Sequence, residues 1–391
     1  MGNGKVIEPD LELIREVRRA GGDTLNKCYQ CATCSVVCNL SPVDKPFPRK
    51  EMLMAQWGRK EELLKDPDLW LCYQCNDCST YCPRGARPGD VLAAIRTYIY
   101  RSFAFPSFMG RALASPKALP ALILVPILIL LACIIFTAPK TADGSYQFLT
   151  SSVIDYNIFL PHSTVDGLFV IGNILIFIFA AIGFLRFWRG LKSSGQETKL
   201  SFIGALIATL KEILAHTSFG KCEANRPRQL GHIFLLYGFI GAMFTTGAVF
   251  IFIFIPHYLA LLGLEQFSSL FALPLELPNP VKILGALSGI ALVVGGVLLV
   301  VRRWKNKDGV GANGYADYLF LYTMFLVGLT GMLSWLMRYT GVPLLAYVNY
   351  FLHMVVVYFL LWYMPYSKFA HMIYRTLALV YARSIGRTAK S

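Results

Sequence analysis

The sequence predicts an all-α protein in two parts, a soluble helical head followed by a bundle of transmembrane helices. Three observations lead to this prediction. Of the 391 residues, 55% are hydrophobic and only 15% are charged, a composition too apolar for a soluble protein of this length. The apolar residues concentrate after residue 117, whereas eight of the ten cysteines lie before residue 83. The region around those cysteines lacks the alternating apolar pattern of β-strands.

The boundaries of the two parts follow the same shift in composition. Residues 1–105 are expected to form the head, and residues 118–391 the membrane domain. Residues 106–117 are expected to link them, because prolines interrupt regular structure there.

Three helices are expected in the head. Residues 9–20 and 49–65 place apolar side chains at helical spacing. A third helix covers residues 91–100, with Asp90 as its N-terminal cap and Pro106 as the residue that stops it. The head is therefore predicted to be helical rather than a βαββαβ fold.

Six apolar segments are each long enough to cross about 30 Å of hydrocarbon as a helix. They cover residues 118–137, 165–187, 229–255, 281–301, 318–337 and 345–365. The connections on one side of this bundle carry 16 Lys and Arg residues, whereas those on the other side carry only Lys140 and Arg338. The positive-inside rule places the basic side, with both termini and the head, in the cytoplasm. Residues 201–217 are shorter and more mixed, and are predicted to form an interfacial helix on the cytoplasmic leaflet.

The formal net charge of +14 lies largely beside the predicted spans, which indicates a membrane surface rather than nucleic acid as the partner. Residues 1–23 are charged and contain no apolar h-region. We therefore expect the head to stay in the cytoplasm, at the inner face of a multi-pass inner-membrane protein, where thiols remain reduced.

The cysteines of the head form two copies of the pattern C-x2-C-x2-C-x3-C, separated by 33 residues. This spacing presents three thiolates to one 4Fe–4S cluster and the fourth to a neighbouring cluster. The crossed pattern predicts one cluster held by Cys28, Cys31, Cys34 and Cys82, and a second held by Cys72, Cys75, Cys78 and Cys38. Zinc sites use pairs of cysteines rather than triplets, and disulfides are not expected in a chain without signs of secretion. The remaining Cys133 and Cys222 are isolated, and we interpret them as a packing residue and a loop thiol.

Histidines are the candidate haem ligands of the membrane domain. His232 lies at the cytoplasmic start of the third span and His371 just after the sixth, so two antiparallel helices can present both imidazoles to one iron. His353 precedes His371 by 18 residues, on the order of 27 Å along an ideal helix, and is the candidate ligand of a second, outer haem.

Three other histidines are weaker candidates. His216 lies at the end of the predicted interfacial helix, where an interfacial role is favoured over iron ligation, although it stays among the candidate cofactor-binding residues. His162 and His257 fall at the outer ends of the second and third spans, and we interpret them as solvated interfacial residues.

The run from Met364 to His371, preceded by His353, resembles the last helix of the cytochrome b subunit of respiratory nitrate reductases, in which two histidines separated in this way bind different haems. The run Arg228-Gln-Leu-Gly-His232 and the apolar residues after it resemble the partner helix of that family.

That family has a second histidine ten residues after the first, where this chain has Ala242 followed by Met243. Four alternatives stay open. The outer haem has a single protein ligand, or it uses Met243, or it is reached by His216 or His257, or it is absent.

The order of the two parts resembles heterodisulfide reductase C joined to heterodisulfide reductase E, and is similar to the C-type membrane subunit of the quinone-interacting membrane-bound oxidoreductases of sulfate reducers. This resemblance implies an α-helical two-cluster ferredoxin head followed by a six-helix transmembrane cytochrome b bundle. It also implies menaquinone as substrate, partners related to the flavoprotein heterodisulfide reductase A, and electron flow toward adenylylsulfate reductase. Lys282 and Arg338, near the outer ends of spans, are candidate residues of a quinone site.

The leading functional hypothesis is a membrane electron-transfer subunit in which quinol is oxidised, haem b carries the electron inward, and the two clusters pass it to a cytoplasmic partner. One alternative is a subunit that serves a heterodisulfide- or sulfite-reducing partner. Another is a redox sensor or membrane anchor. The chain has no G-x-G-x-x-G opening a helix after a strand, so a nicotinamide or flavin site is not indicated.

Overall fold

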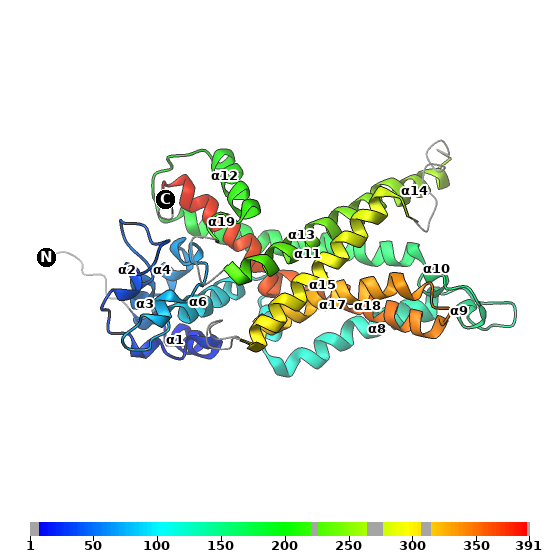
Figure 1. The fold of residues 1–391 in the computed structure, drawn as a ribbon, viewed down its shortest axis with the longest axis horizontal. Coiled ribbons are helices and arrows are strands. Elements are labelled where there is room, and N and C mark those ends of the chain that lie inside the picture. The colour runs from blue at the N-terminus through cyan, green and yellow to red at the C-terminus, as the bar shows by residue number, and fades with distance from the viewer. Residues whose placement is uncertain (1–7, 220–225, 264–276, 306–313, 389–391) are drawn as a thin grey trace.

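The computed structural model describes residues 8–219, 226–263, 277–305 and 314–388. Within these ranges every regular element is a helix or a helical turn. The head lies at one end of an elongated molecule, and the long helices extend from it toward the other end (Figure 1). The predicted division into a helical head and an apolar helical bundle is visible in this arrangement.

The helices of the head differ in three details from the prediction. The first, α1 (Leu11–Val17), is shorter than expected and continues as a π-helical turn, Arg18–Gly22, in which Gly21 has a φ of 106°. Asp10 caps α1, because its carboxylate accepts a hydrogen bond from the Leu13 amide at 2.8 Å.

The predicted helix over residues 49–65 is wrong as a single element. It consists of α3 (Arg49–Gln56) and α4 (Lys60–Leu64), separated by Gly58. Gly58 has a φ of +63°, and a Cβ at this position would lie 2.6 Å from the Asp10 amide nitrogen. The chain therefore turns where only glycine can approach the start of α1.

The predicted capping role of Asp90 is also wrong. The helix α6 (Pro88–Phe103) begins earlier, with Pro88 in its first turn and Arg87 before it in a left-handed conformation. Asp90 lies inside the first turn, where it pairs with Arg87 at 2.7 Å. The helix therefore begins three residues earlier than predicted, at the proline.

Six helices are long and apolar enough to cross a membrane, as predicted. The structure forms them as α8 (Leu119–Thr137), α11 (His162–Lys192), α13 (Arg226–Val249), α15 (Pro280–Lys305), α17 (Tyr315–Met337) and α18 (Pro343–Tyr363). Of the most apolar 18-residue stretch of each span, 44% is buried inside the protein in α18 and only 17% in α13. The sixth span is therefore the central helix of the bundle, and α13 lies at its edge.

Glycines allow the edge helices to touch. A Cβ at Gly238 of α13 would lie 2.8 Å from the Leu292 amide nitrogen of α15, and one at Gly295 would lie 2.8 Å from the Leu235 amide nitrogen. Such close approach of backbones is a usual way of packing helices in lipid, where burial of apolar surface gives no driving force.

The segment expected to be a linker contains α7 (Ser107–Ala114). The segment expected to be an interfacial helix forms α12 (Phe202–Ala215), which packs on the last helix through the buried Ala205 and Thr209. Its Ile203, Ile207 and Leu214 lie on the opposite face and are exposed.

The last helix is not a continuation of α18. Two 3-10 turns, Met364–Tyr366 and Lys368–Ala370, separate α18 from α19 (His371–Ser384). Between them Ser367 is extended, and its hydroxyl accepts a hydrogen bond from the Phe369 amide at 3.1 Å. The chain therefore leaves the bundle and α19 runs back beside the head, next to α12 (Figure 1).

One continuous core joins the head to the membrane domain. Trp70, in the 3-10 turn Asp68–Trp70 of the head, is fully buried. Its ring lies 5.8 Å from Phe187 of α11, 5.4 Å from His371 and 6.3 Å from Tyr374 of α19, measured between ring centroids. The head is thus held by aromatic packing against two helices of the membrane domain.

Replacing Trp70 by Ala should destabilise this junction. Removing a fully buried tryptophan typically costs about 3–5 kcal/mol of folding free energy. We expect a lower denaturation temperature of the detergent-solubilised protein and faster proteolytic release of the head. Trp57 is 51% exposed, so Trp57→Ala is the matched control. Equal effects of the two substitutions would contradict the assignment of Trp70 as the anchor of the junction.

Candidate redox sites

The two cysteine loops have the same backbone conformation. In the first, Gln30 and Ala32 have φ values of 60° and 70°, and a short helix, α2 (Thr33–Val36), follows. In the second, Gln74 and Asn76 have φ values of 52° and 69°, and α5 (Asp77–Thr80) follows. Alternation of right- and left-handed residues turns backbone N–H groups toward one concave side, which suits an anionic group.

The structure groups the cysteines across the two loops. Cys82 of the second loop lines one cavity together with Cys28, Cys31 and Cys34 of the first. Conversely, Cys38 of the first loop lies close enough to the thiols of the second triplet to interact with them electrostatically. The second triplet consists of Cys72, Cys75 and Cys78. These are the two sets that the crossed pattern predicts to ligate separate clusters.

The chemistry of both sets fits a metal cluster. Burial and the neighbouring thiols raise the pKa of Cys34 to about 11 and that of Cys38 to about 12, so these crowded sulfurs need a positive partner to be stable as thiolates. Backbone amides already point at sulfur, because Gln74 donates to Cys72 Sγ and Ala86 to Cys82 Sγ, each at 3.3 Å. An iron–sulfur core would supply the missing positive charge.

The two sets differ in exposure. The first lies at the surface of the head, where Cys31 is exposed and its neighbour Tyr29 is 68% exposed. In the second, Cys72 and Cys78 are buried. The first set therefore reaches the surface of the head through Cys31, whereas all four cysteines of the second set are buried or half-buried.

Two arginines of the membrane domain hold the second loop. Arg228 of α13 donates to the carbonyl oxygens of Tyr73 at 2.6 Å and Gln74 at 3.1 Å. Arg375 of α19 donates to the Cys72 carbonyl oxygen at 3.2 Å, and its guanidinium lies 4.0 Å from the centroid of the Tyr73 ring. Isolated arginines near helix ends gave no signal in the sequence that they would contact a cysteine loop.

His232 lies against His216. His232 Nδ1 and His216 Nε2 are 3.0 Å apart. The other ring nitrogen of His216, Nδ1, lies 3.0 Å from the Leu214 carbonyl oxygen. That carbonyl can only accept, so His216 donates from Nδ1 and its Nε2 accepts from His232 Nδ1–H. The network leaves the lone pair of His232 Nε2 available to a metal.

His353 is oriented in the same way by a threonine. The Thr330 hydroxyl donates to the Leu326 carbonyl oxygen at 2.6 Å and lies 3.0 Å from His353 Nδ1. The hydroxyl therefore accepts from His353 Nδ1–H, and His353 Nε2 keeps its lone pair. Gly331 lies beside the ring, where a Cβ would be 3.0 Å from His353 Cε1.

His371 packs on Trp70 at the start of α19. Burial, Arg375 and Arg96 lower the pKa of His371 well below its usual value, which keeps the imidazole neutral, as metal ligation requires. The hydrogen-bonded partner of His232 in the structure is His216, whereas His371 is its more distant electrostatic neighbour.

Met243 is exposed on α13. The Lys282 amine lies 4.7 Å from the Trp335 ring, and the Arg338 guanidinium 5.7 Å from the Tyr156 ring. His162 begins α11, while Cys222 and the side chain of His257 lie outside the described part of the chain.

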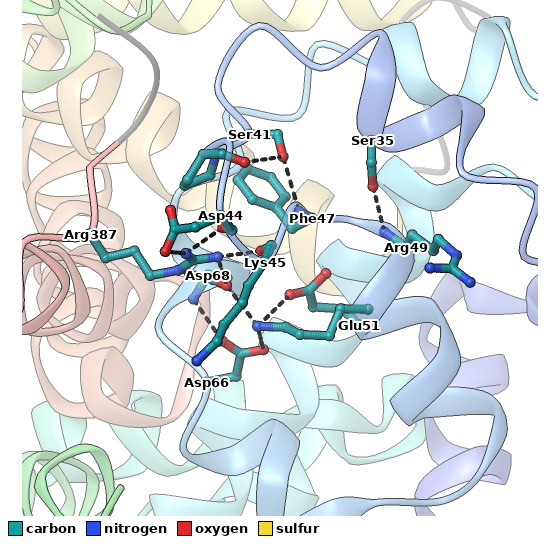
Figure 2. Close-up of polar contacts among 12 residues, drawn as sticks. Ser35, Ser41, Asp44, Lys45, Phe47, Arg49, Glu51, Asp66, Asp68 and Arg387 are labelled. Carbon is teal, nitrogen blue, oxygen red and sulfur yellow. Dashed lines mark hydrogen bonds and ion pairs between the residues drawn. The ribbon is translucent and has the colours of Figure 1, made fainter. Parts of the chain in front are cut away.

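Three buried carboxylates in the head, those of Glu51, Asp66 and Asp68, converge as a metal site would (Figure 2). The Lys50 amine lies among these carboxylates. It is 3.2 Å from a Glu51 oxygen, 3.0 Å from an Asp66 oxygen and 2.7 Å from an Asp68 oxygen. Arg387 of the C-terminal tail also pairs with Asp68. We interpret this cluster as an internal ion-pair network that ties the tail to the head.

Two parts of the chain match the models of two different families. Residues 24–86 match the model of the 4Fe–4S dicluster domain, and residues 112–391 match the family model described as citrate utilization protein B. No solved structure matches the chain.

The similar proteins fall into two groups. The C subunit of the H(2):CoB-CoM heterodisulfide,ferredoxin reductase of Methanothermobacter marburgensis is 37% identical over 90 residues, which cover 22% of this chain and 47% of that protein. A protein of Archaeoglobus profundus described as similar to the C subunit of heterodisulfide reductase is 34% identical over 105 residues, or 27% and 54% of the two chains. The chain thus spans about half the length of these relatives. Citrate utilization protein B of Escherichia coli is 27% identical over 337 residues, or 79% and 80% of the two chains.

Replacing Cys82 by Ser should remove the cluster expected at Cys28, Cys31 and Cys34, because Cys82 shares their cavity. Electron paramagnetic resonance of the reduced protein would show which signal is lost. Cys38→Ser is the reciprocal variant and should remove the other signal. Loss of the same signal in both variants would refute the crossed assignment.

Proposed function

Because the chain belongs to the citrate utilization protein B family and its head is homologous to the C subunit of heterodisulfide reductase, we propose that it is a membrane electron-transfer subunit. It exchanges electrons between menaquinol and cytoplasmic partner proteins that contain flavin or iron–sulfur clusters. Two 4Fe–4S clusters and haem b are the proposed carriers. The observation that carries this proposal is the contact of the second cysteine loop with the end of the bundle that bears His232 and His371.

The two clusters have different places in the proposed route. The set formed by Cys72, Cys75, Cys78 and Cys38 is nearer the membrane domain, because Arg228 and Arg375 hold its loop. The set that contains Cys31 lies at the exposed surface of the head and is the one that a partner protein can reach. In this route the set formed by Cys72, Cys75, Cys78 and Cys38, called the inner set below, lies between the bundle and the set that contains Cys31.

His232 and His371 would together hold the iron of one haem, and His353 would hold that of a second haem. Haem bound there would supply a one-electron carrier. The hydrogen bonds described above support this assignment, since they leave His232 Nε2 and His353 Nε2 free to bind iron. The same network supports a role for His216 in orienting His232 rather than in binding iron.

The identity of the cytoplasmic partner is proposed from resemblance. Flavoproteins related to heterodisulfide reductase A are the expected partners, with adenylylsulfate reductase as the further acceptor if the chain serves sulfate respiration. A heterodisulfide- or sulfite-reducing partner is the alternative within the same class. A redox sensor would bind the same cofactors without sustained quinol turnover, so steady-state oxidation of a menaquinol analogue separates the two functions.

Haem content and spin state test the membrane half of this proposal. We expect one low-spin bis-histidine haem, abolished by His371→Ala, and a second haem abolished by His353→Ala. The second should be high-spin, because Ala242 offers no sixth ligand; a His/Met spectrum would identify Met243 instead.

His216→Leu serves as the control that separates positioning from ligation. It should keep the low-spin spectrum, since His216 contacts His232 and not the iron in this assignment. Absence of haem from the wild-type protein, or an effect of His216→Leu equal to that of His371→Ala, would contradict the assignment.

The orientation of the protein is a further prediction. The basic connections described above support a cytoplasmic position for both termini and the head. A phosphatase that is active only outside the cytoplasm should be inactive when fused after Ser391, and active when inserted at Gly144, which lies in the turn after α8. The reverse pattern would refute the orientation.

A further inference from the structure

Cationic side chains gather where the second cysteine loop meets the bundle. They come from five elements: Arg96 of α6, Arg228 of α13, Arg303 of α15, Lys368 before α19 and Arg375 of α19. Arg96 and Arg228 each interact electrostatically with Arg375, and Lys368 interacts with Arg303, Arg96 and Arg228. Within the described part of the chain, the carboxylate paired with this group is that of Asp317, which contacts Lys368. Such an excess of positive charge away from water is costly unless anions accompany it.

Some of this charge faces the inner cysteine set. Arg96 is 5% exposed and donates to the Leu69 carbonyl oxygen at 2.8 Å, while Arg228 and Arg375 donate to carbonyls of residues 72–74. A 4Fe–4S cluster with four thiolate ligands carries net negative charge, and would compensate part of the excess.

Two guanidinium nitrogens of this group, Nη1 of Arg303 and Nη2 of Arg375, are buried and have no hydrogen-bond acceptor among the residues that the structure describes. Burial and the neighbouring guanidinium groups also lower the pKa of Lys368 to about 7, despite its contact with Asp317. A buried guanidinium N–H without an acceptor is rare, and marks a place where an anion is expected.

The positions of these residues relate them to the two proposed iron ligands. Arg228 precedes His232 by four residues on α13, and Arg375 follows His371 by four residues on α19. Residues four apart lie on one face of a helix, so each histidine has an arginine one turn nearer the head on its own face. A macrocycle held between the two histidines would therefore meet cations at its edge toward the head.

We propose that Arg303, Lys368 and Arg375 form a carboxylate-binding site that receives the propionate groups of the haem held by His232 and His371. Guanidinium groups bind carboxylates through paired, charge-assisted hydrogen bonds, which the free Arg303 and Arg375 nitrogens can supply. This inference rests on the proposed function, because it requires haem at that position.

The test measures the haem midpoint potential in full-length Arg303→Gln and Arg375→Gln proteins by optical redox titration. Each variant should keep a low-spin haem with a lower potential than wild type, because removing a nearby cation favours the more positive ferric state. Lys305→Gln is the matched control, since Lys305 is exposed on the same helix as Arg303. Its potential should equal that of wild type.

Cluster signals recorded on the same samples distinguish the possible anions. A shift confined to the cluster signals would show that the cations serve the cluster alone, and unchanged potentials would show that they serve neither; both results overturn the carboxylate site. If wild-type protein contains no haem, the proposed function fails, whereas haem with an unaltered potential in the variants refutes only this site.

A second measurement does not depend on the variants folding. Haem-depleted wild-type protein is reconstituted with haem b or with its dimethyl ester, whose propionates cannot carry charge. The ester should bind at least roughly tenfold more weakly, because hydrogen bonds to charged groups are the stronger class. Equal affinity for the two haems would overturn the proposal.

Discussion

The structure depends on the burial of one short segment, residues 68–75, between the head and the bundle. This segment contains Trp70, which anchors the shared aromatic core, and two cysteines of the inner set. Its carbonyl groups are the acceptors for arginines from three different helices. Packing and backbone hydrogen bonds thus fix the same few residues.

Charged side chains are buried near the junction in two different arrangements. In the head, the Lys50 amine sits among three buried carboxylates, so that the charges nearly cancel within the cluster. At the end of the bundle, the cations outnumber the carboxylates in the described residues. The first arrangement is complete with the protein's own side chains. The second leaves an excess of positive charge among the described side chains.

Sequence patterns predicted the parts of this protein that depend on local chemistry. The six spans follow from length and hydropathy, and the grouping of the cysteines follows from their spacing. Prediction failed where the local conformation depends on contacts with distant parts of the chain. Gly58 divides an expected helix because it must approach Asp10, and Pro88 rather than Asp90 begins α6. The contacts of Arg96, Arg228 and Arg375 with the cysteine loop join residues up to 303 positions apart, and no local pattern reports them.

The packing of α19 against the head makes an early part of the chain depend on a much later one. The head packs on α19, and Arg387, which follows that helix, contacts Asp44 and Asp68 of the head (Figure 2). Arg375 of α19 donates to the carbonyl oxygen of Cys72, 303 positions before it. The second cysteine loop therefore cannot acquire its final contacts during synthesis until α19 has been translated.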